Sequence, residues 1–112
     1  MSGANVHHWR NQRISALVLI PLTLWFVAAI YAHLGDDHAQ FVAWLSRPLP
    51  ALLMAALVVS AAYHFAVGVR EVLVDYVQDP RLHRLSKSAV YLGNLALTLI
   101  ALAALAKIWL GG

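Results

Sequence analysis

The side chain with the clearest chemical potential is His64, an imidazole in the middle of an apolar segment. Ionisable groups at membrane depth are costly to hold and are usually kept for a function. At about 100° per residue, Ser60, His64, Gly68, Glu71 and Asp75 fall within about 40° of one line along a helix. This stripe offers an imidazole, two small residues and two carboxylates to a flat ligand. Gly68, one turn beyond His64, leaves room for a large ring held by the imidazole.

Three roles are open for His64 on the residues alone. It can hydrogen-bond a neighbouring helix as a packing residue, belong to the proton or ion path of a small transporter, or ligate haem iron, which imidazole suits. A transporter path predicts more polar groups across the membrane than Thr23, Asn94 and Thr98 supply. All three roles remain open, and the transporter path has the least support from the residues.

Three long apolar segments must position these residues, and they predict an all-α membrane protein in a single domain, 1–112. The transmembrane helices are expected at about residues 14–34, 50–74 and 89–110. Arg13 and Ser15 stand at the start of the first of these helices. The three helices are therefore expected to form part of a helical bundle that a second membrane subunit completes.

The connections between the predicted helices are polar. In the first, Gly35 to Pro50, Phe41, Trp44 and Leu45 read as a short amphipathic turn at the membrane surface. After the second helix the residue before Pro80 is biased away from helical geometry, so we predict a helix stop there. A polar loop is then expected to carry four basic or histidine side chains, Arg81, His83, Arg84 and Lys87.

Composition supports the membrane assignment, because 62% of the 112 residues are hydrophobic and only 12% are charged. Soluble domains carry about 25% charged residues. The chain has no cysteine, which excludes disulfides, thiolate catalysis and cysteine-ligated clusters. Its net charge of +3 is small and lies beside the apolar segments, so it indicates topology in a lipid bilayer and not a nucleic-acid partner.

The basic residues are unevenly distributed between the two sides of the predicted membrane protein. They concentrate before the first helix and between the second and third helices, whereas the first loop has only Arg47 and the C-terminal end only Lys107. Cytoplasmic segments carry the excess of Lys and Arg. We therefore expect the N-terminus in the cytoplasm and the C-terminus outside.

The spacing from His64 and Gly68 to the pair Asp75-Tyr76 resembles the second transmembrane helix of a known family. That family is the hydrophobic membrane-anchor subunit of bacterial and mitochondrial succinate dehydrogenase, and chain length and the three apolar segments match as well. The resemblance implies that His64 is an axial ligand of the iron of haem b, with Gly68 beside the ring. It also implies that Asp75 and Tyr76 lie at a ubiquinone pocket.

The resemblance implies a further pair of cofactor-binding residues at the start of the first helix. In the anchor subunits, basic and hydroxyl residues at this level lie near the haem propionates and the quinone headgroup. Arg13 and Ser15 are the residues that match them.

A six-coordinate haem needs two axial ligands, and this chain has one histidine at mid-membrane depth. His33 lies near the outer end of the first helix, whereas His64 is about 14 residues, or about 21 Å, in from that side. We therefore expect the second ligand to come from another chain. This agrees with the resemblance, which implies a cytochrome b membrane subunit as the partner.

The resemblance implies a subunit that is not an enzyme on its own. It would anchor iron-sulfur and flavoprotein subunits to a bacterial inner membrane, in a complex that passes electrons from succinate to ubiquinone. No G-x-G-x-x-G signature for a flavin or nucleotide is present. The alternative is a small homo-oligomeric transporter or a haem-binding membrane protein that acts alone.

Overall fold

The computed structural model describes residues 3–111, with the side chains of residues 3–6 and 8 left aside. This part of the chain forms four helices and no strand: α1 (Gly3–Ala32), α2 (His38–Leu45), α3 (Pro48–Tyr76) and α4 (Pro80–Trp109). Helices α1, α3 and α4 are each long and apolar enough to cross a membrane. The prediction of an all-α protein with three transmembrane helices is confirmed.

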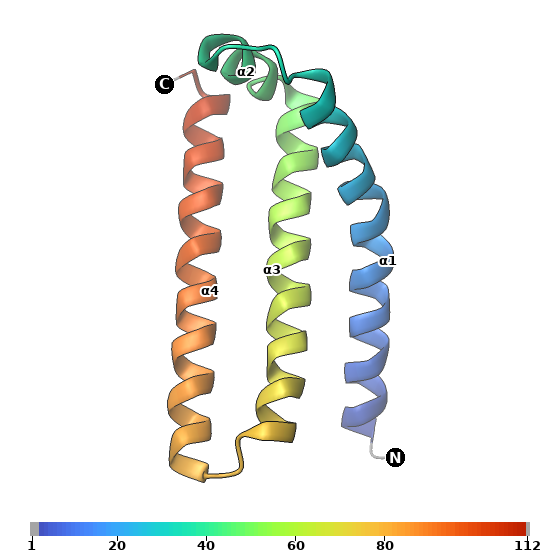
Figure 1. Cartoon of the computed structure of the whole chain (residues 1–112), viewed down its shortest axis with the longest axis vertical. Helices are drawn as coiled ribbons and strands as arrows, with labels where there is room; N and C mark the ends of the chain where they lie inside the picture. The colour runs from blue at the N-terminus through green and yellow to red at the C-terminus, as the bar shows by residue number, and fades with distance from the viewer. Residues whose placement is uncertain (1–2, 112) are drawn as a thin grey trace.

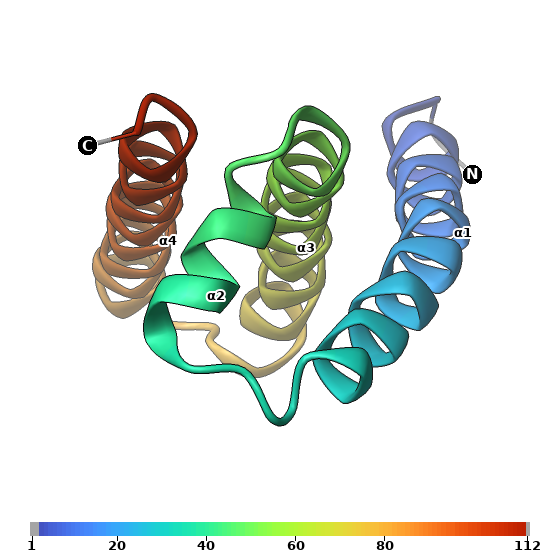
Figure 2. The same ribbon diagram turned by 90° about the horizontal axis from the view of Figure 1, so that it is seen from above.

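Helix α3 is the centre of the molecule, with α1 on one side and α4 on the other (Figure 1). Within residues 3–111, α1 and α4 do not contact one another. Figure 2 shows that α1 crosses α3 at an angle and that α2 lies across one end of the long helices. The three long helices therefore form an open layer and not a closed bundle.

Few apolar side chains are buried within the chain itself. Among the described side chains the buried apolar ones are Leu45, Ala51, Val67, Leu73 and Leu105. In the most hydrophobic stretch of each long helix, 6 to 11% of the residues are buried. In water this much exposed apolar surface would drive association. In a membrane the same surface is covered by lipid or by a second membrane subunit.

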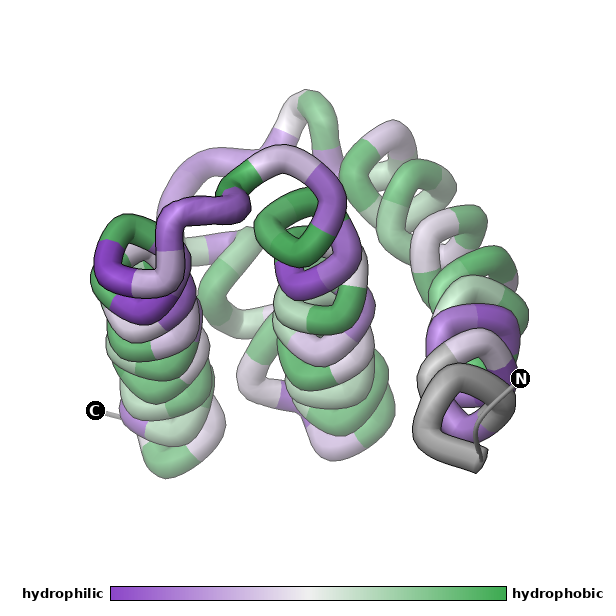
Figure 3. The backbone as a smooth tube through the Cα atoms, turned by 90° about the horizontal axis from the view of Figure 1, so that it is seen from below, coloured by the Kyte–Doolittle hydropathy of each residue, from purple (hydrophilic) through white to green (hydrophobic). Residues whose placement is uncertain are grey.

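The long helices are longer than the hydrocarbon layer is thick. A helix of 30 residues measures about 45 Å, against about 30 Å for the hydrocarbon core, and the molecule extends 49 Å along its longest axis. Figure 3 shows hydrophilic backbone at the connection between α3 and α4, with mostly hydrophobic helix beyond it. The helix ends therefore project into the headgroup region.

Helix α4 begins earlier than predicted, and the predicted polar loop is wrong. The Asp79 side chain accepts a hydrogen bond from the Arg81 backbone N–H at 3.0 Å and so caps the helix. Pro80 occupies the first turn, where its missing N–H costs nothing. Only residues 77–79 connect α3 to α4. The four side chains assigned to the loop, Arg81, His83, Arg84 and Lys87, are all helical.

Helix α1 also begins before the predicted boundary. It starts at Gly3, and its candidate membrane span covers Trp9–Ala32. Hydropathy marks where a helix enters lipid, but the backbone stays helical until a residue breaks it, and no proline stands between Gly3 and Pro21. The residues before 14 therefore add about three turns to α1.

The predicted amphipathic turn is the short helix α2. The Asp37 carboxylate accepts from the Gln40 backbone N–H at 2.8 Å, and the Gln40 side chain accepts from the Asp37 N–H at 2.9 Å, a reciprocal capping box. The Trp44 ring lies 4.3 Å from the His33 ring and 6.1 Å from the Trp25 ring, centroid to centroid. These aromatic contacts hold α2 against the end of α1.

Candidate functional site

His64 of α3 meets Ser15 of α1 where the two helices pack together. The Ser15 Oγ lies 2.9 Å from the His64 Nδ1. Ser15 is the only polar residue buried among the described side chains, at 6% exposure, while His64 is half-buried. Among the described side chains the other ring nitrogen, Nε2, has no hydrogen-bond partner. The packing contact thus uses one nitrogen of the imidazole and leaves the second available.

Ser15 is also bound to its own helix. Its Oγ donates to the Gln12 backbone carbonyl at 2.9 Å, which is an i to i−3 contact. A serine in a membrane helix satisfies its hydroxyl in this way when no water is present. The hydroxyl oxygen therefore links a carbonyl of α1 to the imidazole of α3.

Gln12 is a residue of this site that the sequence did not reveal. A Cβ added at Gly68 would lie 3.8 Å from the Gln12 Nε2, so the amide of α1 occupies the space over Gly68. The Gln12 Oε1 is buried and has no hydrogen-bond partner in the described part of the chain. Buried polar atoms are rarely left unpaired. The i, i+3 spacing of Gln12 and Ser15 was the available signal, but it counts only if the helix begins before residue 14.

The contacts of Gly68 differ from those predicted. The sequence suggested a ligand ring over this glycine, and here a side chain of α1 lies over it at ordinary van der Waals distance. The small residue therefore has a packing neighbour. Its place beside a haem ring stays a prediction.

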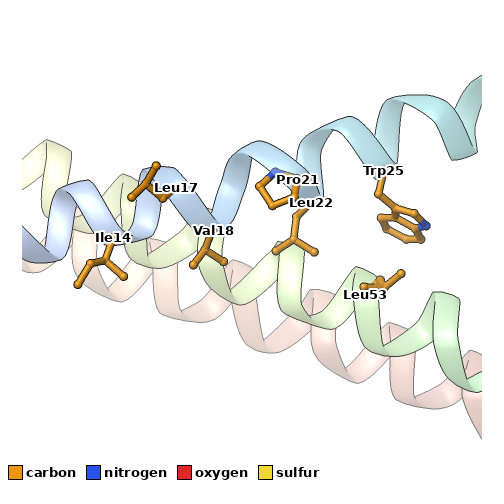
Figure 4. Close-up of a pocket in the computed structure, with 7 residues that line it drawn as sticks. All are labelled: Ile14, Leu17, Val18, Pro21, Leu22, Trp25 and Leu53. Carbon is orange, nitrogen blue, oxygen red and sulfur yellow. The ribbon is translucent and has the colours of Figure 1, made fainter.

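Two grooves lie between α1 and α3. One, of about 350 Å³, has four polar residues in its lining, Asn11, Ser15, Ser60 and Tyr63. The other, of about 570 Å³, is lined by apolar side chains of α1 and by Leu53 of α3 (Figure 4). Figure 4 shows Trp25 and Leu53 pointing toward one another across this groove, where α1 diverges from α3. Of these two grooves, the one beside Ser15 therefore carries the polar groups.

Arg13 does not join Ser15 and His64. Two residues along a helix rotate the side chain by about 200°, so Arg13 and Ser15 lie on nearly opposite faces of α1. The Arg13 side chain is exposed, and its Cζ lies 5.0 Å from the centre of the Trp9 ring. This cation-π contact holds the guanidinium on the outer face of the helix.

Asp75 and Tyr76 lie at the end of α3, away from His64. Twelve residues of helix separate Tyr76 from His64, which corresponds to about 18 Å. Both side chains are exposed, and Tyr76 is 80% exposed. The six predicted site residues therefore separate into a cluster of Ser15, His64 and Gly68, a pair at the end of α3, and Arg13 apart from both.

Helix α4 packs on the other side of α3 through Asn94. The Asn94 Nδ2 donates to the Ala62 carbonyl at 3.1 Å, and the Thr98 Oγ1 donates to the Asn94 carbonyl at 2.7 Å. Asn94 is therefore a packing residue between α4 and α3. Gly93, in contrast, has no neighbouring atom within 4 Å of a built Cβ, so it faces away from the chain.

Three other histidines have described contacts, and one of them is His7, whose Nδ1 accepts a hydrogen bond from the Arg10 guanidinium at 2.9 Å. His33 pairs with the Asp36 carboxylate at the far end of α1, and the His83 Nδ1 donates to the Val77 carbonyl at 3.2 Å. Seventeen residues from Ser15 to Ala32 span about 26 Å, which separates His33 from His64 as predicted. Among the described residues no three His, Cys, Asp or Glu side chains converge on a common point.

Comparison with known proteins also identifies the chain as a membrane subunit. The sequence model of the succinate dehydrogenase/fumarate reductase transmembrane subunit family matches residues 2–103. A succinate dehydrogenase hydrophobic membrane anchor subunit from Rickettsia bellii (strain RML369-C) is 31% identical over 95 residues, covering 85% of this chain and 75% of that protein. The subunit of the same name from Paracoccus denitrificans is 36% identical over 72 residues, covering 64% of this chain and 55% of that protein.

The match is not limited to one motif. A further relative of that name, from Rickettsia typhi (strain ATCC VR-144 / Wilmington), is 25% identical over 103 residues, covering 89% of this chain and 79% of that protein. With three long apolar helices and a family match over nearly its whole length, the chain belongs to the succinate dehydrogenase/fumarate reductase transmembrane subunit family.

Proposed function

We propose that the chain is the hydrophobic membrane anchor of a succinate dehydrogenase, and that it helps to bind haem b and ubiquinone. In this role it holds iron-sulfur and flavoprotein subunits at the membrane and has no catalytic activity of its own. The observation that carries the proposal is His64, a mid-helix imidazole with one nitrogen bound to Ser15 and the other without a partner among the described side chains. The family match supports it.

The residues around His64 fit one axial position of a haem. A neutral imidazole nitrogen is a normal ligand for haem iron, and a hydrogen bond to the second nitrogen orients the ring. His64 has both features. Haem, when bound, supplies a centre that accepts and donates one electron. The part of this chain is to hold the iron through His64 and to keep the ring in place through Ser15.

The open helix layer supports a second membrane subunit as the partner. Two other histidines, His33 and His83, are bound at other places in the chain, which favours a second axial ligand from a different chain. We propose that a cytochrome b subunit covers the exposed face of α3 and supplies this ligand.

Tyr76 and Asp75 are the proposed contribution of this chain to a ubiquinone site. A phenol donates a hydrogen bond to a quinone carbonyl, and that bond strengthens as negative charge develops on the oxygen during reduction. The neighbouring carboxylate can orient the phenol or pass protons, of which reduction to quinol consumes two. The exposure of both side chains leaves them accessible to a membrane-borne ligand.

The end of the molecule that carries Tyr76 is the proposed docking end. The N-terminus and the α3 to α4 connection lie together at this end, and the C-terminus lies at the other (Figure 1). Arg10, Arg13, Arg81 and Arg84 belong to the same end of the chain. The excess of positive charge favours a cytoplasmic location for it, in a bacterial inner membrane with the C-terminus in the periplasm.

Replacing His64 tests the haem proposal directly. We expect His64→Ala to remove an axial ligand, so that the purified complex loses haem or gives a changed spin state in its redox-difference spectrum. His33→Ala and His83→Ala are matched controls, because both rings are bound far from His64, and they should leave the spectrum intact.

An unchanged spectrum in the His64 variant would show that this ring only packs against Ser15. The purification itself adds a second criterion. Co-elution with iron-sulfur and flavoprotein subunits is expected in mild detergent, whereas a self-contained oligomer of this chain would contradict the anchor role.

A further inference from the structure

We propose that Ser15 is a positioning residue that selects the tautomer of His64 and so presents the Nε2 lone pair to the iron. The inference rests on the proposed haem ligation and deepens it, because it assigns the orientation of the ligand to a residue of another helix. It is carried by two hydrogen bonds at one oxygen. The Ser15 Oγ lies 2.9 Å from the Gln12 carbonyl oxygen and 2.9 Å from the His64 Nδ1.

The number of protons at this oxygen decides the direction of each bond. A hydroxyl has one hydrogen, and a carbonyl oxygen can only accept, so the Ser15 hydrogen is used on Gln12. The His64 Nδ1 must then donate its own hydrogen to the Ser15 Oγ. A neutral imidazole carries one N–H, so Nε2 has no hydrogen and keeps a free lone pair.

The alternative hydrogen placement is incompatible with iron binding. If Ser15 donated to Nδ1, the ring hydrogen would be on Nε2, and the only lone pair would be the one already used by Ser15. The serine would then block ligation. Because Ser15 is buried between α1 and α3, a second arrangement through solvent is not available to it. The carbonyl of Gln12 therefore acts through Ser15 on the protonation of both ring nitrogens of His64.

The hydrogen bond from His64 to Ser15 also affects how tightly the ring binds iron and at which potential that iron is reduced. An N–H donated to an acceptor raises the basicity of the opposite nitrogen, and loss of such a partner typically weakens metal affinity by about 10 to 100-fold. A more basic ligand favours the ferric state. Removing the Ser15 hydroxyl should therefore loosen the haem and move its midpoint potential to a more positive value.

The experiment uses the intact complex with Ser15→Ala, Ser15→Thr and Thr98→Val. For Ser15→Ala we expect about a 10-fold loss of haem affinity, measured as haem per flavin, and a positive shift in midpoint potential. Ser15→Thr keeps the hydroxyl and should restore the potential of the haem that is bound. Thr98→Val is the control, because the Thr98 hydroxyl bonds only within α4 among the described residues. Parental affinity and potential in Ser15→Ala would overturn the assignment.

A second measurement separates this inference from the haem proposal. Nitrogen NMR of the complex assembled without haem, with ¹⁵N-histidine in this chain, reports which ring nitrogen of His64 carries hydrogen. We expect Nδ1–H in the parent and in Ser15→Thr, and a mixture of tautomers in Ser15→Ala. An Nε2–H tautomer in the parent would overturn the inference even if His64 binds haem. A correct tautomer with an unchanged His64→Ala spectrum would instead reject the haem proposal.

Discussion

Tyr76 is exposed at the end of α3, where an outside molecule can reach its phenol. We expect Tyr76→Phe to assemble with normal haem and to oxidise succinate normally with an artificial soluble acceptor, but to lose most quinone reduction. The reason is that phenylalanine keeps the ring and removes only the hydrogen-bond donor. Asp75→Asn should cause a milder loss, because an amide can still orient the phenol but holds no titratable proton. Quinone reductase assays of the purified complex measure both effects.

The same assay can also contradict the quinone role of Tyr76. If Tyr76→Phe reduces quinone at the parental rate and with parental inhibitor sensitivity, the quinone role of this residue is wrong. Tyr76 would then belong with Trp9 and Tyr91 as an aromatic residue that holds the chain at the membrane surface.

Gly68 allows a graded test of its packing against Gln12. A Cβ at this position would lie 3.8 Å from the Gln12 Nε2, which is ordinary contact, so Gly68→Ala should leave haem per flavin unchanged. Gly68→Leu is larger and must displace Gln12, which lies one turn before Ser15, so we expect it to reduce haem retention. Equal retention in both variants would show that the space over this glycine has no bearing on the cofactor.

At the scale of single residues, the sequence predicts which side chain is a candidate for function, but it does not predict which residues that side chain contacts. His64 was identifiable because hydropathy isolates it in an apolar segment. Its bond to Ser15 depends on the register between α1 and α3, which no local pattern encodes. Gln12 was missed for a related reason, since the residues before position 14 were assigned outside the first helix and their faces were not considered.

Helix α4 is attached to α3 by one hydrogen bond from a side chain, the bond from Asn94 to the Ala62 carbonyl. Interhelical hydrogen bonds in membranes contribute about 0.6 kcal/mol on average. We expect Asn94→Leu to lower the stability of the complex by about this amount, measured by denaturant titration in detergent. Gly93→Ala is the control, because no atom of the chain lies within 4 Å of the added methyl group. A larger loss in the glycine variant would mean that this face of α4 contacts another subunit.

Among the elements, the number of membrane-spanning helices could be predicted, whereas the residues at which these helices begin and end could not. Three apolar segments of about 20 residues suffice to predict three membrane helices. Hydropathy marks the boundary with lipid, and α1 and α4 continue as helix beyond it. At Asp79-Pro80 the signal was present but ambiguous, because a proline that ends one helix is also favourable in the first turn of the next.

The topology of the whole molecule can be tested with a reporter that is active only in the cytoplasm. Inserted at Gln78, in the short connection between α3 and α4, the reporter should give a strong signal. Fused after the last residue it should give none, because the basic residues keep the other end inside. The opposite pattern would place Asp75 and Tyr76 on the periplasmic side, away from any cytoplasmic iron-sulfur subunit.

The arrangement of the whole molecule was only partly predictable. Charge and hydropathy predict three membrane-spanning helices and their orientation, but they do not predict whether the first and third of these helices pack against one another. In the described chain α1 and α4 each pack against α3 and do not contact one another. Part of a helical bundle was expected of this chain, and the open layer of three long helices agrees with that expectation.

The open layer also has a consequence for the abundance of the chain in a cell. Because so little of the chain is buried internally, binding of the proposed second membrane subunit would stabilise its native state by mass action. The amount of folded chain should then rise and fall with the supply of that subunit.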